Sequence, residues 1–221
     1  VYSLLAGHWY GTKRQWMTQK AGLAMLGAFY FMLLIFVQFL IITDLAMSLV
    51  PGWKDAIFPM YHTISSFQAG VAGVVIALWA ARRHVKLEKY VHVDAFWSLG
   101  RLLFALTLLW VYFFYSSFIV FWYGRSAGDV AWVELLIKGP MLYAFIAGAV
   151  LIWFVPWWIL IWNRVRRSVN GMAIGAAVIL VGVMLDRIRI FVPAWSVPPE
   201  KIHEKWLHEI PDTVYPDVFD I

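Results

Sequence analysis

Five long apolar stretches limit what this chain of 221 residues can fold into. A helix of about 20 residues crosses the roughly 30 Å hydrocarbon core of a bilayer, and each stretch reaches that length. The run Val178–Val183 does not alternate polar and apolar residues, so helices are expected rather than the strands of a membrane barrel. The sequence therefore predicts an all-α, polytopic transmembrane helix bundle of about five spans, at residues 21–49, 56–81, 99–122, 135–162 and 169–192.

Composition supports this class of protein. Hydrophobic residues make up 62% of the chain and charged residues 14%, which excludes an ordinary soluble domain. The 14 Trp, 10 Tyr and 16 Phe residues fit the aromatic belts of membrane interfaces. Because the chain has no Cys, it contains no thiolate-bound iron–sulfur cluster, and such a redox centre would belong to a partner subunit.

Basic residues predict the orientation of the spans. If five spans alternate in direction, eleven of the eighteen Lys and Arg residues fall on one face, which the positive-inside rule makes cytoplasmic. Segment 1–20 is then cytoplasmic, residues 21–195 form the bundle in an inner (cytoplasmic) membrane, and tail 196–221 is external or periplasmic. Lipid headgroups are expected partners and nucleic acid is not, because no basic cluster stands apart from a helix end. The eleven residues are Lys13, Arg14, Lys20, Arg82, Arg83, Lys86, Lys89, Arg101, Arg164, Arg166 and Arg167.

Three ionisable residues lie within or at the ends of the predicted spans. Asp44 ends the first span, His62 lies in the first turns of the second, and Asp186 lies near the outer end of the fifth. Such residues cost about 2.5–3.5 kcal/mol each at a helix centre, so they are usually retained for a reason. All three fall toward the outer leaflet in this topology, where one pocket could supply proton acceptors and apolar walls to a quinol headgroup.

Structural explanations stay open for each of these residues. Asp44 could cap the turn that leads to Pro51, and Asp186 could pair with Arg187 or Arg189. His62 could be an interfacial histidine bonded to lipid or backbone. The sequence alone does not separate these explanations from a role in proton transfer.

A second group of polar residues lies along the third predicted span. Tyr112, Ser116 and Tyr123 share roughly one helix face, because they follow one another at steps of three and four residues or their multiples. These hydroxyls, with Arg101, could line a proton path, or they could bond to neighbouring helices, which is the commoner arrangement.

Small residues and prolines predict how the helices meet. Gly70, Gly73, Gly171 and Gly175 are expected at close contacts between helices, and Pro140 and Pro156 are expected to interrupt the fourth span.

No resident metal or haem is expected. Only His62 of the six histidines lies inside a predicted span, so a haem held by two histidines has no pair of ligands. His203 and His208 could chelate a cation weakly in the tail, although a solvated amphipathic segment is the commoner explanation. The chain has no glycine-rich phosphate loop and no recognisable hydrolytic triad.

Two sequence patterns resemble the NrfD/PsrC superfamily of quinone-interacting membrane subunits, and most of all the ActF-type subunit of alternative complex III. Each pattern starts at the end of one apolar stretch or the beginning of another. The first consists of Asp44, Met47, Ser48, Leu49, Pro51, Trp53, Phe58, Tyr61, Phe67, Gly70 and Ala72. The second consists of Leu99, Gly100, Leu102, Leu103, Phe104, Ala105, Trp110, Tyr112, Ser116, Trp122 and Tyr123.

The resemblance implies a function in electron transport. It implies one NrfD-type four-helix bundle plus an extra helix, in a complex with a multihaem cytochrome c, iron–sulfur subunits and a second NrfD-like membrane subunit. It further implies that menaquinol or another quinol contacts His62, Trp53 and Tyr61, that Asp44, His62 and Asp186 accept its protons, and that no cofactor is covalently bound. Members have about twice as many spans, so the chain is expected to be part of a longer subunit or a half-length variant.

The sequence departs from the family pattern at some polar positions. Ser98 stands where an Asp usually precedes Leu-Gly, Arg101 replaces a Lys, and Ser117 replaces a Gln. Three hypotheses therefore remain: a quinol-site or proton-path subunit, a cofactor-free anchor for peripheral electron carriers, and a proton translocator without a quinone.

Overall fold

The computed structural model describes residues 13–49, 55–84, 88, 91–124 and 141–196. These residues are almost entirely helical, and none of them forms a strand. The elements are α2 (Lys13–Ile41), η1 (Ile42–Ala46), η2 (Met47–Leu49), α3 (Phe58–His84), α4 (Val93–Gly124), α6 (Met141–Ala149), η4 (Val150–Phe154), α7 (Val155–Ile161), α8 (Asn163–Arg166) and α9 (Val169–Ser196).

Five helical segments are long and apolar enough to cross a membrane, as the sequence predicts. They are Gln19–Ala46, Phe58–His84, Val93–Gly124, Leu142–Ile161 and Val169–Val192. The third span begins at Val93, six residues before its predicted start at residue 99, because residues 93–98 already belong to helix α4. The predicted start of the fourth span at 135, including Pro140, lies outside the described residues.

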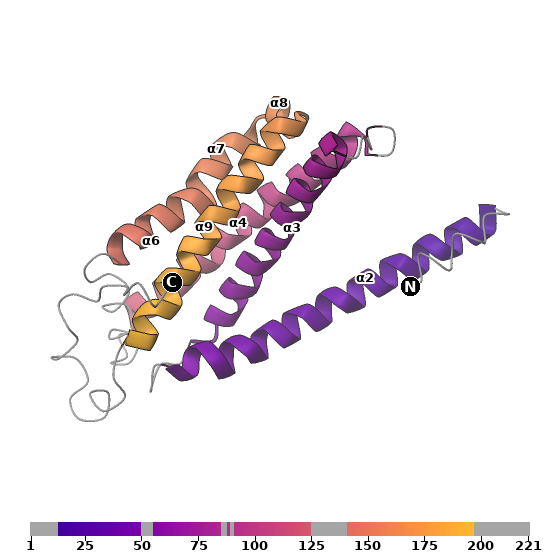
Figure 1. Cartoon of the computed structure of the whole chain (residues 1–221). Helices are drawn as coiled ribbons and strands as arrows, with labels where there is room; N and C mark the ends of the chain where they lie inside the picture. Colours follow the sequence, from indigo (N-terminus) through magenta and orange to yellow (C-terminus); the bar gives the residue numbers. More distant parts are fainter. Residues whose placement is uncertain (1–12, 50–54, 85–87, 89–90, 125–140, 197–221) are drawn as a thin grey trace, which may run out of the picture.

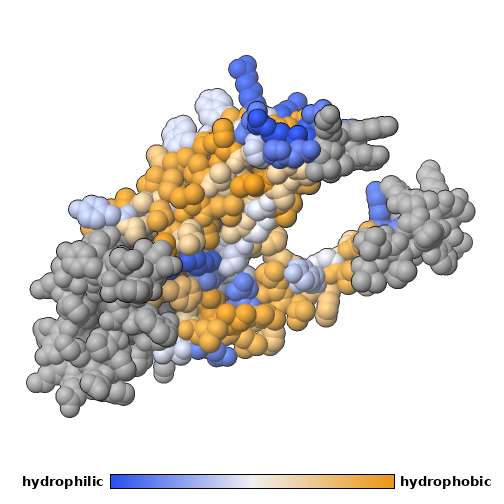
Figure 2. All heavy atoms as spheres, viewed as in Figure 1, coloured by the Kyte–Doolittle hydropathy of each residue, from blue (hydrophilic) through white to orange (hydrophobic). Residues whose placement is uncertain are grey.

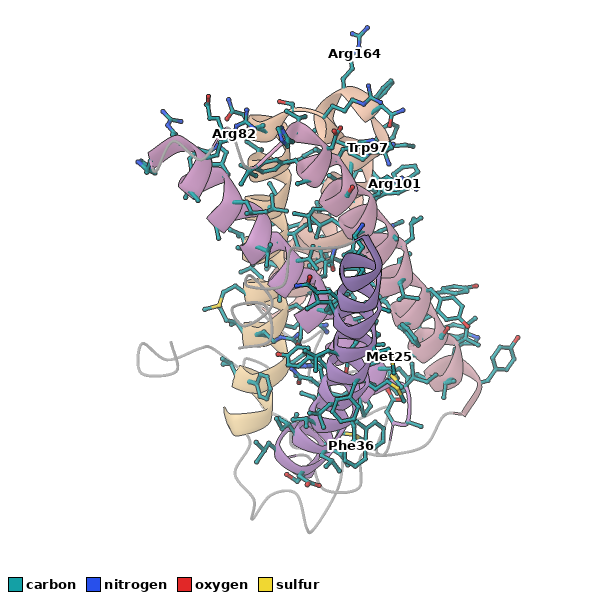
Figure 3. The ribbon with its side chains drawn as sticks, turned by 90° about the vertical axis from the view of Figure 1, so that its right-hand side faces the viewer. Met25, Phe36, Arg82, Trp97, Arg101 and Arg164 are labelled. Carbon is teal, nitrogen blue, oxygen red and sulfur yellow. The ribbon has the colours of Figure 1, made fainter. Side chains whose placement is uncertain are left out.

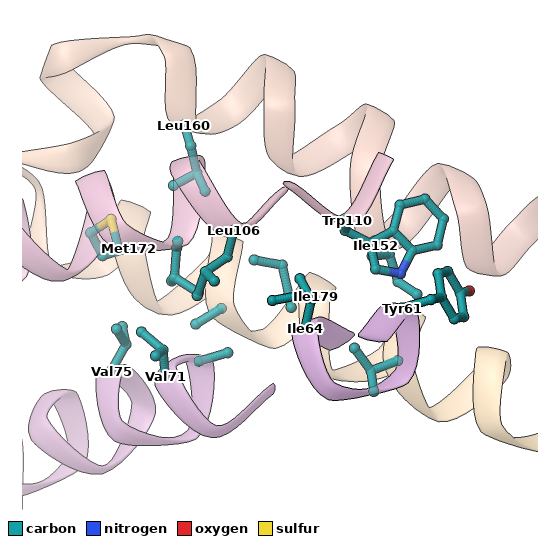
Figure 4. Packing of buried hydrophobic residues seen from close by; sticks show 14 of the residues in the cluster. Tyr61, Ile64, Val71, Val75, Leu106, Trp110, Ile152, Leu160, Met172 and Ile179 are labelled. Atoms are coloured by element: carbon teal, nitrogen blue, oxygen red, sulfur yellow. The ribbon is translucent and has the colours of Figure 1, made fainter. Parts of the chain in front are cut away.

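The last four spans form a bundle (Figure 1). α9 packs against both α3 and α6, α3 packs against α4, and α4 packs against α7. The core between them extends from Tyr61 and Trp110 at one end to Leu160 and Met172 at the other (Figure 4). These side chains pack closely against one another instead of against lipid. Such packing is the main force that joins helices in a bilayer.

Helix α2 differs from the bundle helices because most of it lies apart from them (Figure 1). Only 6% of the most apolar window of its span is buried, against 39% for the α9 span. Met25 and Phe36, both exposed, project from it (Figure 3). Its last turns and η1 return to the bundle, where Ile42 and Ala46 are buried beside α3.

The fourth span is interrupted near Pro156, as predicted. A π turn, η4, immediately precedes α7, and Pro156 occupies the start of α7. Proline has no N–H to donate to the carbonyl of Ile152, four residues earlier. The Nε2 atom of Gln68 lies 3.4 Å from that carbonyl oxygen and donates to it from the neighbouring helix α3.

Glycines allow α9 to approach the fourth span closely. A Cβ atom at Gly182 would lie 2.8 Å from backbone atoms of Leu151 and Ile152, and one at Gly148 would lie 3.6 Å from the backbone nitrogen of Asp186. Gly175 packs against Leu160, as expected. The predicted close contacts at Gly70 and Gly73 are wrong within the described structure. Nothing lies within 4 Å of a Cβ atom at either position, since both face away from the packed helices.

Candidate functional site

A buried cluster of charged and polar side chains joins the beginning of α3 to the end of α9. The Tyr61 hydroxyl donates to Oδ1 of Asp186 at 2.8 Å. Arg189 donates to the same oxygen through Nε at 3.2 Å and through Nη2 at 2.5 Å. Tyr61, Asp186 and Arg189 are 4%, 2% and 5% exposed, so this ion pair is enclosed by protein.

Additional contacts compensate this buried ion pair. Charges withdrawn from water need each other and further hydrogen bonds, because desolvation otherwise outweighs their attraction. Nη2 of Arg189 lies 3.3 Å from the Tyr61 hydroxyl oxygen, and its guanidinium carbon lies 4.8 Å from the centre of the Phe145 ring. Tyr61 thus joins the carboxylate and the guanidinium into one network.

A second cation stands beside this network. Nη2 of Arg187 donates to the backbone oxygen of His62 at 3.3 Å and to Oγ of Ser66 at 3.0 Å. Both acceptors are uncharged. Among the described hydrogen bonds of the cluster, only Arg189 bonds to the carboxylate of Asp186, so Arg187 has no bonded carboxylate of its own there.

Several buried polar atoms of the cluster have no hydrogen-bond partner among the described residues. They are Nδ1 and Nε2 of His62, Oδ2 of Asp186 and Nη1 of Arg187. Most buried polar groups are paired, so unpaired ones indicate a site for a ligand or water. A neutral imidazole offers one acceptor and one donor nitrogen, the carboxylate oxygen accepts, and the guanidinium nitrogen donates.

Aromatic rings enclose the cluster. His62 lies between Phe58 and Phe191, whose ring centroids are 5.7 and 6.0 Å from its own. Tyr61 lies 5.5 Å from Trp110, which is stacked on Phe114. Apolar walls around a few polar groups are typical of sites for small organic ligands.

Local packing explains how these groups meet. Tyr61 and His62 are adjacent in the first turns of α3, and Asp186 and Arg189 lie one turn apart on α9. α3 and α9 make an extensive contact along the bundle. Gly182, one turn before Asp186, also allows η4 to lie directly on α9.

The structure brings some of the predicted site residues together. Asp186 bonds to Tyr61 and pairs with Arg189, and Arg187, next to Asp186, bonds to the carbonyl of His62, so His62 and Asp186 lie at the same end of the bundle, as the topology suggested. Asp44 lies in η1 with an exposed side chain, and its backbone oxygen accepts a hydrogen bond from Ser48. Trp53, the other predicted quinol contact, lies outside the described residues.

The predicted proton path lies on a different surface. Tyr112 and Tyr123 are 62% and 83% exposed on α4, and Ser116 donates to the backbone oxygen of Tyr112 within the same helix. Arg101 is also exposed, in the first third of α4. No hydrogen bond links these side chains to another helix in the described part of the chain, so their role stays a prediction.

A polar group deeper in the bundle was not predicted from the sequence. Gln68 is fully buried and donates through Nε2 to Oγ1 of Thr107 at 3.0 Å, while Thr107 donates to the Leu103 carbonyl. Oε1 of Gln68 and Oγ of the buried Ser65 have no partner among the described residues. A glutamine amid apolar residues in the second span was the available signal.

These observations define a multi-pass, all-helical integral membrane protein with a buried ionisable site at one end of its bundle. Residues 5–199 match the family described as polysulphide reductase, NrfD, and the chain belongs to this NrfD family. No curated protein matches the chain. Family membership indicates a membrane subunit of a quinol oxidoreductase-type complex, and members typically partner with iron–sulfur and cytochrome subunits.

Proposed function

We propose that this chain interacts with quinol in a quinol:electron-acceptor oxidoreductase of the alternative complex III type, and that the α3–α9 cluster accepts the protons of quinol. The main support is the set of unpaired polar atoms on His62, Asp186 and Arg187. The imidazole of His62 is flanked by the rings of Phe58 and Phe191, which offer apolar walls to the flat headgroup of a quinol.

The chemistry needs proton acceptors here and an electron acceptor elsewhere. Oxidation of a quinol to a quinone releases two protons and two electrons. His62 accepts the proton of one hydroxyl at its free ring nitrogen and Asp186 accepts that of the other at Oδ2, while Arg187 donates a hydrogen bond to one of the two oxygens as it becomes a carbonyl. The electrons pass to a haem or iron–sulfur centre of a partner, since the chain has no Cys to hold a cluster.

In this proposal the cluster lies at the external or periplasmic end of the bundle. Asp44, at the same end, receives protons that leave the site, and Trp53 contributes to the quinol pocket. A multihaem cytochrome c, iron–sulfur subunits and a second NrfD-like subunit complete the complex, and menaquinol or another quinol is the donor. The ActF-like motifs around Asp44 and Gly100 support this assignment.

Substitutions in the purified complex test the proposal. His62→Gln and Asp186→Asn are expected to slow quinol-driven reduction of the partner haems by about 100-fold or more, the usual effect of losing an acid–base group. His92→Gln and Asp94→Asn are matched controls, because both residues are exposed near the start of α4. Subunit content and thermal unfolding show whether each variant assembles.

Labelling with a photoreactive quinone separates the quinol site from the alternatives. Crosslinks to α3 or α9 that excess quinol abolishes are expected in the native complex. If quinol oxidation stays normal in assembled His62→Gln and Asp186→Asn complexes and no crosslink forms, the proposal is wrong, and the chain is an anchor or a proton translocator without a quinone.

A second candidate function, proton translocation without a quinone, is favoured by one further observation. Ser65 and Gln68 follow His62 at three-residue steps along α3, and both are buried. They extend the polar cluster toward Thr107 in the interior of the bundle. If the chain translocates protons, Gln68→Leu in liposomes would abolish proton movement while electron transfer continues. If the chain holds only a quinol site, proton movement and electron transfer would both persist in this variant.

A further inference from the structure

The end of the bundle that holds α8 carries most of its described basic side chains. Hydrophilic residues gather there, while the sides of the bundle are apolar (Figure 2). Figure 3 shows Arg82, Arg101 and Arg164 at this end, with Trp97 beside Arg101. The described arginines here are Arg82, Arg83, Arg101, Arg164, Arg166 and Arg167.

Two of these arginines share one aromatic ring. The guanidinium carbon of Arg101 lies 4.9 Å from the centre of the Trp97 ring, and that of Arg167 lies 5.5 Å from it. Arg101 and Trp97 belong to α4, whereas Arg167 follows α8, so tertiary packing brings the charges together. No hydrogen bond or ion pair joins the guanidinium group of Arg101 or Arg167 to another described residue; the backbone N–H of Arg167 donates to the Asn163 carbonyl.

The side chains of Trp97, Arg101 and Arg167 offer donors and no acceptor. Nε1 of Trp97 is buried without a hydrogen-bond partner among the described residues, and so is Nε of Arg166, whose Nη2 donates to Oδ1 of Asn163 at 2.7 Å. An indole N–H and guanidinium groups can only donate. Like charges held at one ring repel each other, so an anion with several acceptor oxygens would both pair the donors and offset the repulsion.

An uncovered apolar strip runs along α4 from this basic group. Ala105, Leu108 and Leu109 lie four, seven and eight residues after Arg101, on its side of the helix, and all three are exposed. The surface therefore combines a cationic, donor-rich end with an apolar strip directed along the membrane normal. An amphiphile with an anionic head and a hydrocarbon tail has the complementary shape.

We infer that Trp97, Arg101 and Arg167 bind the phosphodiester of an anionic phospholipid whose acyl chain lies along α4. Guanidinium groups bind phosphate oxygens through paired hydrogen bonds, and the indole N–H adds a further donor. Free phosphate would leave the strip beside Arg101 unused, and so would an acidic protein bound at the membrane surface. The site is independent of the proposed quinol chemistry, because it lies at the opposite end of the bundle.

Lipid binding by the delipidated, purified complex tests this inference. Native mass spectrometry and thermal unfolding in neutral detergent would compare phosphatidylglycerol, phosphatidylcholine and inorganic phosphate. The native complex is expected to bind phosphatidylglycerol preferentially, and Arg101→Gln/Arg167→Gln is expected to bind it about 30-fold more weakly. Arg164→Gln is the matched control, because its side chain points away from Trp97 at the same end (Figure 3).

A second variant removes only one donor. Trp97→Phe keeps an aromatic ring beside both arginines but loses the N–H, so phosphatidylglycerol binding should weaken by several-fold, about the effect of one hydrogen bond. Its milder structural change keeps the test valid if the double variant fails to assemble.

Three results would overturn the inference. Equal binding of phosphatidylglycerol and phosphatidylcholine would mean that the charges are unimportant. Displacement of phosphatidylglycerol by millimolar inorganic phosphate would indicate a site for free anions. Loss of a partner subunit from the Arg101→Gln/Arg167→Gln complex, with lipid binding unchanged, would identify the surface as a subunit contact.

Discussion

The two ends of the bundle hold their arginines in opposite ways. At one end Arg189 is buried and bonded to Asp186 and Tyr61. At the other end Arg101 and Arg167 lie exposed beside Trp97, without a described acid partner. The first arrangement stabilises charges inside the protein, and the second leaves them available to a ligand from outside. Burial thus separates Arg189, which pairs with Asp186, from Arg101 and Arg167, which face outward.

The largest difference between the two ends is expected when a buried charge loses its partner. Arg189→Met leaves the Asp186 carboxylate buried without its counter-ion, which should destabilise the complex by about 3–5 kcal/mol. Arg164→Met, at the exposed end, should change stability by less than about 0.5 kcal/mol. Thermal unfolding of the purified complexes in one detergent measures both.

A double substitution sharpens this comparison. Asp186→Leu/Arg189→Met removes both charges, so most of the stability lost in Arg189→Met should return. Quinol oxidation should stay low, because the proton acceptor is absent. A double variant as unstable as Arg189→Met would show that the ion pair is not the source of the difference.

Helix packing next to the cluster should give the second-largest effect. A side chain at Gly182 would meet the backbone of η4 at 2.8 Å, and backbone cannot yield as a flexible side chain does. Gly182→Ala is therefore expected to destabilise the bundle by about 1–3 kcal/mol. Gly70→Ala is the matched control and should be neutral or slightly stabilising, because its Cβ atom meets nothing and alanine favours helix.

The outcome at these glycines also shows what sequence analysis could predict. Hydropathy is a local property, so the five spans and the helical class followed from the sequence. The position of His62 and Asp186 at one end of the bundle followed from alternating spans. Whether a glycine lies at a close helix contact, as Gly182 does and Gly70 does not, depends on which helix face meets a neighbour. No periodicity in an all-apolar span specifies that face.

The same reason explains what else the sequence left open. Arg101 and Tyr123 both lie on α4, about 33 Å apart along a helix that rises 1.5 Å per residue, so their shared role with Tyr112 in a proton path stays a prediction. The contact between Gln68 and Ile152 depends on the carbonyl that precedes Pro156, which only tertiary structure brings to α3. Local signals located the polar residues but could not pair them.

The hydroxyl of Tyr61 should contribute an effect of about the same size as that of Gly182→Ala. Tyr61→Phe keeps the ring beside Trp110 and removes the hydrogen bond to Asp186, so a loss of about 1–3 kcal/mol is expected for a bond to a charged group. Tyr123→Phe removes an exposed hydroxyl at the far end of α4 and should leave the unfolding temperature unchanged. Equal shifts in both variants would contradict the assigned role of Tyr61.

The smallest effect is expected from the neutral contact in the bundle interior. Gln68→Leu removes the donor to Thr107 and to the Ile152 carbonyl, and Thr107 keeps its bond to Leu103. Hydrogen bonds between membrane helices contribute about 0.6 kcal/mol on average, so the unfolding temperature should fall only slightly. A loss as large as that of Arg189→Met would mean that Gln68 holds η4 in its π turn, because the freed Ile152 carbonyl then has no other partner from α3. In that case Gln68, a neutral side chain, would stabilise the bundle as strongly as the ion pair does. It would act by holding the bend at η4, against which α9 and therefore Asp186 are positioned.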